Sequence, residues 1–511
     1  MRAERLKRYL MLLLPWAAGL VIFGLIIWLA SRFGPLNYDE ARFDIVRLAW
    51  RTLLKIPWWI LHGGVDFARA QAEVGLKGFF VLNFTAKPLW MMSLIVSSFI
   101  SAHWVTMALP TGLGLGFYVY FLMRQSVPWP IRCATFLCLA LSPLVWLLGS
   151  AALSNFGAGL ALFTAVYIAR ENLNAKRSIY VGILMMIALF LHYAIGPLLA
   201  VLAVYLFLRD RLWKKTDIIW YFLAVVLIFF ILVEGSTLIA TIVLAKAYTG
   251  STFTPYWQEL MHQFKATAED GAKLNPFYYS IIFWKLEGAL FALVTALSCL
   301  ATFFYKAVRQ DQTARTAAIL LVVGIPSYSL LATQGLRVWA FFLPLIFWLL
   351  LSVGAVVWSG LSKYPVGRFI LLLLFLTITI GQRWTYLVDL ANLRQPHRLI
   401  REAIAKKENL AGVPLVVASV YHWPNQALDQ HYPVQALKLG GSFSLESNQT
   451  ALLEYPEFFP SLSNEFEKQC SAVGGTLSSL SWSDISQYRW TQDMGIVERN
   501  IGQKVTYCLR R

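Results

Sequence analysis

The sequence predicts an all-α polytopic membrane domain followed by a small α/β domain at the C-terminus. The chain has 511 residues, of which 58% are hydrophobic and only 14% are charged, whereas a soluble domain carries about 25% charged residues. It contains many apolar runs of the roughly 20 residues that cross a bilayer as a helix. Lys and Arg recur in short loops between these runs, which is typical of multi-span membrane proteins.

About eleven apolar runs make up the predicted membrane domain, residues 1–382. The first run, from about residue 10 to 29, follows a basic N-terminus. Its length and the lack of a small-residue cleavage site favour an uncleaved span over a secretory signal peptide. The later runs cover 108–124, 130–149, 152–169, 178–193, 195–208, 217–236, 286–305, 316–332, 339–358 and 369–382.

Every second loop between the runs is basic, and this pattern sets the predicted orientation. Cytoplasmic loops are the ones enriched in Lys and Arg, so we expect a cytoplasmic N-terminus and, after an odd number of spans, an extracytoplasmic C-terminal domain. The net charge of +17 is thus explained by topology, and no nucleic-acid partner is expected. The cytoplasmic cations are Arg124, Arg132, Arg170, Lys176, Arg177, Arg209, Arg211, Lys214, Lys215, Lys306, Arg309, Arg315, Lys363 and Arg368.

The predicted extracytoplasmic domain covers residues 383–511. Its charges nearly balance, with 13 Lys or Arg against 12 Asp or Glu. Apolar segments at 413–419 and 504–509 predict buried strands, and helices are expected near 394–408 and 461–471. Cys470 and Cys508 both fall in this domain. Because paired cysteines in an oxidising compartment are often bonded, we expect a disulfide between them.

Two long outer segments, about 31–107 and 237–285, indicate an active site at the membrane surface. In the first, Asp39 and Glu40 follow the first span, and Arg42 shares a helix face with Asp39. Capping of a helix N-terminus explains Asp39 equally well. Further on, Lys87 precedes a proline; it is either an anchor whose charge reaches the interface or a cation for a lipid phosphate.

The order of these motifs resembles the GT-C glycosyltransferases, and more narrowly the protein O-mannosyltransferases and lipid A aminoarabinose transferases. The resemblance covers roughly residues 10–350. It includes the acidic pair, the Lys87-Pro88-Leu89 motif and Arg337-Val-Trp-Ala-Phe-Phe-Leu-Pro344, which is similar to the Arg-Tyr-x-x-Pro stretch of the family.

Three departures from the family pattern accompany the resemblance. The chain has Leu89 where the family usually has a second proline, and Ala108 where it has an arginine before Leu-Pro. It has Ser154 and Asn155 where an aspartate often stands near the start of the fourth span. These differences indicate a divergent member.

The resemblance implies an enzyme that transfers a hexose or pentose from a polyprenyl-phosphate donor to an acceptor hydroxyl at the outer face. Asp39 matches the catalytic aspartate of the family and is the expected general base, with Glu40 as the alternative. Arg42, Lys87 and Arg337 are the expected ligands of the donor phosphate, because negative charge develops there in the transition state. An interfacial anchor is the other interpretation of Arg337.

Three further residues are candidates for substrate binding. His192 and Tyr193 end the fifth span on the outer side. Either they bind the phosphate or the sugar, or they form a pair at the membrane interface whose hydrogen bonds are already satisfied. Glu234 lies inside a span, where ionisable residues are functional by default, although Lys285 is a candidate partner. No spacing of a metal motif such as His-Glu-x-x-His is present; some GT-C enzymes use a divalent ion, and the sequence neither requires nor excludes one.

Other functions predict other patterns. A lipid-linked glycan transporter or flippase predicts charged or broken helices around a midplane cavity and repeated halves, which this sequence lacks. Another glycan-assembly protein, such as a polymerase or ligase, predicts a large outer loop late in the chain, and a scaffold leaves the Asp39, Arg42, Lys87 and Arg337 set unexplained. We expect a bacterial inner-membrane enzyme whose partners are membrane lipid, the polyprenyl-linked donor and a glycan, lipid or protein acceptor.

Overall fold

A computed structural model of the full chain gives the architecture. It describes residues 2–32, 108–150, 154–247, 277–331, 335–393, 396–410, 415–419, 434–436, 449–453, 460–481 and 504–510, together with single positions at 87, 89, 90, 93, 96, 99, 100, 106, 258, 261, 445 and 446.

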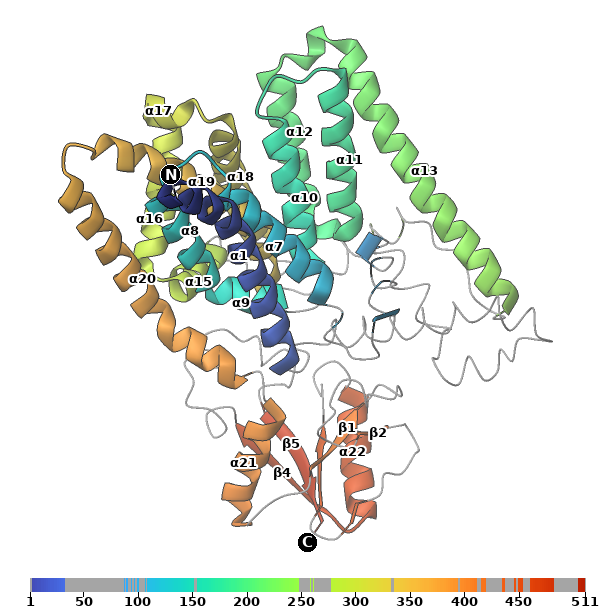
Figure 1. Ribbon diagram of the computed structural model, residues 1–511. Coiled ribbons are helices and arrows are strands. Elements are labelled where there is room, and N and C mark those ends of the chain that lie inside the picture. Colours follow the sequence, from blue (N-terminus) through green and yellow to red (C-terminus); the bar gives the residue numbers. More distant parts are fainter. Residues whose placement is uncertain are drawn as a thin grey trace.

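The described part of the chain is an all-α membrane domain with a small α/β domain beyond its last long helix (Figure 1). The helices of the membrane domain are α1 (Arg2–Arg32), α7 (Leu109–Met123), α8 (Trp129–Ala140), α9 (Pro143–Ser150), α10 (Asn155–Ile168), α11 (Ala175–Leu191), α12 (Gly196–Arg209), α13 (Thr216–Ala247), α15 (Tyr278–Glu287), α16 (Ala289–Phe304), α17 (Lys306–Arg309), α18 (Gln312–Leu331), α19 (Trp339–Gly360) and α20 (Pro365–Leu393).

Each predicted apolar run coincides with one helix or, for 130–149, with the pair α8 and α9. This pair is bent by 59° at Ser142–Pro143, because proline lacks the amide proton of a continuous helix. Among the described residues, four helices are long and apolar enough to cross a membrane alone, and the bent pair gives a fifth. The chain is a multi-pass membrane protein, and the count of eleven spans stays a prediction.

Three helices differ in extent from the predicted runs. Helix α13 continues to Ala247, about a dozen residues beyond the predicted end at 236, because the sequence there stays apolar and contains no proline. Helix α15 begins at Tyr278 inside the predicted outer segment 237–285 and ends just beyond it at Glu287. Helix α20 runs through the predicted domain boundary at 382/383 and ends at Leu393; the boundary between the two domains stays a prediction.

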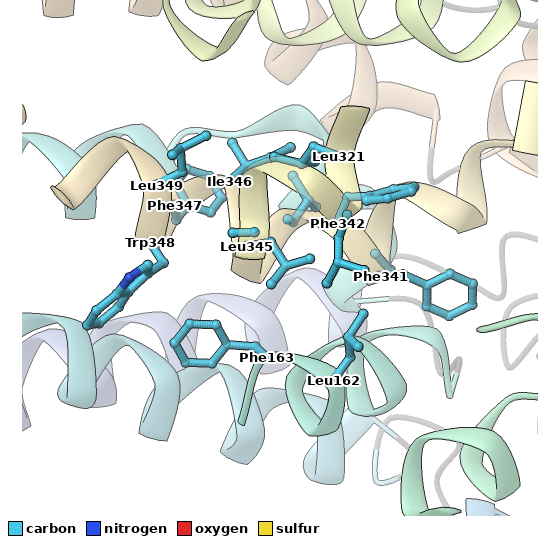
Figure 2. Close-up of a cluster of buried hydrophobic side chains, with 14 of the residues drawn as sticks. Leu162, Phe163, Leu321, Phe341, Phe342, Leu345, Ile346, Phe347, Trp348 and Leu349 are labelled. Carbon is cyan, nitrogen blue, oxygen red and sulfur yellow. The ribbon is translucent and has the colours of Figure 1, made fainter. Parts of the chain in front are cut away.

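Helix α19 forms the centre of the membrane domain. Its apolar side chains are buried nearly all round, which is typical of a helix in the core of a bundle. Figure 2 shows Phe341, Leu345 and Trp348 of α19 facing Leu162 and Phe163 of α10. The Phe163 and Trp348 rings lie 5.6 Å apart between centroids.

The two ends of the membrane domain differ in charge. The loops that join α10 to α11, α12 to α13 and α19 to α20 lie at the end farthest from the C-terminal domain (Figure 1). These loops carry predicted cytoplasmic cations such as Arg170, Lys215 and Lys363. We call this end the basic end, and the end that faces the C-terminal domain the sheet end.

The C-terminal domain contains a mixed five-stranded sheet with the order β2-β1-β3-β5-β4. The strands are β1 (Leu415–Ser419), β2 (Val434–Ala436), β3 (Thr450–Leu453), β4 (Thr476–Ser481) and β5 (Lys504–Leu509), and the helices are α21 (Pro396–Glu408) and α22 (Pro460–Ala472). Strand β1 pairs in parallel with β2 and β3, and β5 pairs antiparallel with β3 and β4.

Two interactions attach the helices of this domain to the sheet. The Tyr507 hydroxyl of β5 donates to Glu408 Oε1 of α21 at 2.5 Å. Cys470 of α22 and Cys508 of β5 form a disulfide with 5.7 Å between their Cα atoms, as the sequence predicts for this pair.

Candidate active site

The predicted site residues fall into three groups in the structure. Asp39, Glu40 and Arg42 lie outside the described residues, and so does most of the predicted outer segment 31–107. Arg337, His192 and Tyr193 lie around the first turn of α19. Glu234 lies on α13, and Lys87 lies two residues before Leu89, which packs on α11 and α13.

Arg337 is placed by the start of α10. It belongs to a 3-10 turn, Gly335–Val338, directly before α19. Its carbonyl oxygen accepts a hydrogen bond from Asn155 Nδ2 at 3.4 Å, and Asn155 is 1% exposed. The close approach of α10 to α19 depends on Gly159, where a Cβ atom would come within 2.9 Å of Phe341 Cα. Helix packing therefore positions the backbone that carries Arg337.

His192 and Tyr193 form the bend between α11 and α12. His192 Nδ1 accepts a hydrogen bond from the amide of Ala194 at 3.2 Å, so the imidazole caps the 3-10 turn Tyr193–Ile195. The His192 ring stacks on Tyr193 and meets Phe341 of α19 edge-on, with 5.5 Å between centroids. Because Phe341 lies about one helical turn after Arg337, His192 and Arg337 lie at the same end of α19.

Several buried polar atoms near this turn have no hydrogen-bond partner among the described residues. They are Ser154 Oγ, Asn155 Oδ1 and Trp339 Nε1. Ser154 is fully buried and Trp339 is 1% exposed. Most buried polar groups in proteins are satisfied by protein or water, so three such atoms around one turn indicate a place where water or a polar ligand binds.

Lys87 and Glu234 lie near a small apolar cluster of Met186, Phe190 and Val233. Leu89, two residues after Lys87, packs against this cluster, and Glu234 directly follows Val233 on α13. Phe190 lies two residues before His192 on α11. The end of α11 therefore connects the segments of Lys87 and Glu234 to the Arg337 turn.

A buried ion pair in the membrane domain was not predicted from the sequence. Glu287 and Arg383 are both fully buried and lie 2.5 Å apart between Oε2 and Nη2. The sequence instead predicts Arg383 as the first residue of the C-terminal domain. An acidic residue at the edge of the apolar run 286–305 was the available signal, because an ionisable residue in a span needs a partner.

Metal binding has no candidate within the described part of the chain, where no three His, Cys, Asp or Glu side chains gather. The acidic pair Asp39 and Glu40 falls outside that part.

Comparisons with known proteins identify the fold. No protein-family model matches the chain, and no curated protein matches it by sequence. A crystal structure of ArnT from Cupriavidus metallidurans bound to undecaprenyl phosphate superposes on it with a TM-score of 0.52 and 13% identity, covering 97% of both chains. The apo structure of the same protein covers equal shares with a TM-score of 0.49. The chain thus has the fold of ArnT over nearly its whole length, in agreement with the fold class that the sequence predicts.

Proposed function

We propose that this protein is an integral membrane glycosyltransferase. In this proposal it moves a sugar, a hexose or a pentose, from a polyprenyl-phosphate donor to an acceptor hydroxyl at the sheet end of the membrane domain. With the basic end in the cytoplasm of a bacterium, the N-terminus is cytoplasmic and the C-terminal domain lies on the outer side of the inner membrane, where it meets the acceptor.

The observation that carries the proposal is the Arg337 turn at the sheet end. A cation, the His192 imidazole that caps the neighbouring 3-10 turn, and three buried polar atoms without a partner among the described residues surround one end of α19. They do so in a fold shared with a protein that binds undecaprenyl phosphate in its crystal structure. A phosphate with an apolar tail needs a cation at the interface, and Arg337 supplies one at this turn.

The chemistry assigns a role to each residue. Asp39, or Glu40 in its place, takes the proton of the acceptor hydroxyl as its oxygen attacks the anomeric carbon. The bond between that carbon and the phosphate oxygen breaks, and Arg42, Lys87 and Arg337 stabilise the charge left on the lipid phosphate. His192, Tyr193 and Glu234 orient the donor through hydrogen bonds.

The test is a transfer assay on membranes that contain the full chain. Polyprenyl-phosphate donors carrying a labelled hexose or pentose are supplied, and the label is followed from lipid to acceptor. We expect Asp39→Asn to lower the transfer rate by roughly 10²- to 10⁴-fold, the usual contribution of a general base. Comparison with Glu40→Gln shows which of the two carboxylates is the general base.

Asp217→Asn is the matched control, because Asp217 is exposed in the first turn of α13 at the basic end. It should retain full activity. Full activity of both Asp39→Asn and Glu40→Gln would show that neither residue is the general base. Label that crosses the membrane while still lipid-linked, with none on an acceptor, would identify a flippase instead.

A further inference from the structure

An apolar groove lies between α8, α16, α19 and α20, in the half of the membrane domain nearer the basic end. Its volume is about 260 Å³. Val357 and Leu371 line it and are 53% and 57% exposed. Since the outer surface of this domain faces lipid, the groove opens sideways into the bilayer.

The depth of the groove corresponds to part of one leaflet. On α8 the lining runs from Ile131 to Cys138, and on α20 from Arg368 to Phe375, at positions that share one helix face. At 1.5 Å per residue each side is about 10 Å long. One leaflet contributes about 15 Å of a hydrocarbon core about 30 Å thick. A groove of this depth accommodates much of one acyl chain.

A cation stands at the mouth of the groove. The Arg368 guanidinium lies over the Trp358 ring, 4.4 Å from its centroid, and Nη1 is 3.5 Å from the Trp358 carbonyl oxygen. Arg368 Nε is buried and has no hydrogen-bond partner, and within the described ranges no carboxylate lies within ion-pair distance of this side chain. The guanidinium therefore keeps free donors for an anion.

Further positive charge lies in the adjoining turn, which contributes Leu361 to the groove lining. Lys363 is exposed in the turn between α19 and α20, and Arg368 lies in the first turn of α20, where the helix dipole also favours an anion. A guanidinium matches the geometry of phosphate oxygens. Charge at the mouth and apolar lining below it together define a ligand with an anionic head and a hydrocarbon tail.

We propose that this groove is a binding site for an anionic phospholipid of the leaflet at the basic end. The phosphate lies on Arg368 and Lys363, and one acyl chain fills the groove down to Cys138. This site is separate from the Arg337 turn, which lies at the opposite end of α19.

The lipid supplies packing that the protein itself does not. In the apolar part of α20, Pro365–Val388, only 6% of the residues are buried inside the protein. The deep end of the groove also adjoins the ion pair, because the Cys138 carbonyl accepts a hydrogen bond from Arg383 Nη1 at 2.6 Å. A bound acyl chain thus holds α20 against α8 and α16, and binding to the folded state raises thermal stability.

Native mass spectrometry of the full chain, purified in a neutral detergent, tests the proposal. Phosphatidylglycerol and phosphatidylcholine of equal chain length are titrated separately. We expect selective binding of one phosphatidylglycerol, a higher melting temperature with that lipid, and roughly tenfold weaker binding in Arg368→Gln, as for a lost charged hydrogen bond. Arg309→Gln is the matched control, because Arg309 is an exposed arginine at the same end outside the groove.

A second variant keeps the head-group site and blocks the tail. Val357→Trp fills the groove from an exposed position, so it is compatible with folding even where Arg368→Gln is not, and it should abolish the selective binding. Equal affinity for the two lipids, or equal loss in Arg368→Gln and Arg309→Gln, would overturn the proposal. Displacement of phosphatidylglycerol from the wild type by an equimolar polyprenyl phosphate would also overturn it and assign the groove to that lipid.

Discussion

Glu287 and Arg383 lie 96 residues apart in the sequence and form an ion pair that no solvent reaches. The pair lies beside two interruptions of the helices, the bend between α8 and α9 and the junction of α15 with α16. Glu287 Oε1 accepts hydrogen bonds from Ser142 Oγ at 2.5 Å and from the Leu144 amide at 3.1 Å, at the N-terminus of α9. Arg383 Nη1 donates to the Cys138 carbonyl at the C-terminus of α8.

Each charge therefore faces the helix end of opposite polarity, because helix N-termini attract anions and C-termini attract cations. Arg383 also lies over the Phe291 ring, 4.1 Å from its centroid. The pair joins the α8–α9 bend, the junction of α15 with α16, and α20, and so links the last long helix to the bundle.

Removal of one partner of this pair should destabilise the protein strongly. Arg383→Met leaves a buried carboxylate without its counter-charge, which costs about 3–5 kcal/mol. We expect a large fall in the melting temperature of the purified protein in detergent. The double variant Glu287→Leu/Arg383→Met should recover much of the loss, because neither charge remains buried.

Glu171→Gln is the control for this experiment. Glu171 pairs with Arg177 at the surface, with 55% and 33% of the side chains exposed, and such pairs contribute at most about 1 kcal/mol. If Arg383→Met proved as mild as Glu171→Gln, the pair would have no structural role.

The contact between α10 and α19 gives a second prediction. In Gly159→Ala the new methyl meets the Ala340 carbonyl and Phe341 Cα, so the helices must separate and shift Asn155 and Arg337. We expect lower stability together with lower transfer activity. Gly24→Ala is the control, because a Cβ there meets nothing within 4 Å; alanine in place of a helical glycine should be neutral or slightly stabilising. Equal behaviour of the two variants in both measurements contradicts the prediction.

Arg337 should act on the chemical step as well as on binding. Loss of a group that stabilises charge in the transition state costs roughly 10²- to 10³-fold in kcat, so Arg337→Gln should lower kcat for sugar transfer by that order. Arg337→Lys should recover part of it, because lysine keeps the charge without the planar fork of donors. If Arg337→Gln changed KM alone, or changed neither KM nor kcat, Arg337 would be an interfacial anchor.

The disulfide of the C-terminal domain closes a segment with a sequence separation of 38. Chain entropy predicts that the Cys470→Ser/Cys508→Ser variant loses about 4 kcal/mol of domain stability. A Cβ atom at Gly475 would clash with the Cys508 sulfur and press on the Cys470 sulfur, so Gly475→Ala should hinder bond formation. Maleimide labelling of denatured protein, with and without reductant, counts the thiols. Labelling of these two cysteines before reduction would show that the bond is absent.

Much of the fold follows from the sequence because membrane helices are specified locally. Apolar length and the placement of Lys and Arg predict most of the described membrane helices, although not α15 and α17, since each lipid-exposed backbone must satisfy its own hydrogen bonds. The strands β1 and β5, and the pairing of Cys470 with Cys508, were also predictable. The assignment of Asp39, Glu40 and Arg337 to the site rests on the order of short motifs along the chain and stays a prediction.

Tertiary structure alone decided the rest. The partners Glu287 and Arg383, the contact of Asn155 with the Arg337 turn, and the groove below Arg368 each join residues from helices far apart in sequence. No local pattern encodes such a pairing, because it depends on how helix faces meet and on where a helix breaks. For the same reason α20 extends past residue 382: its polar Arg383 is tolerated among apolar residues only because a carboxylate from another helix lies beside it.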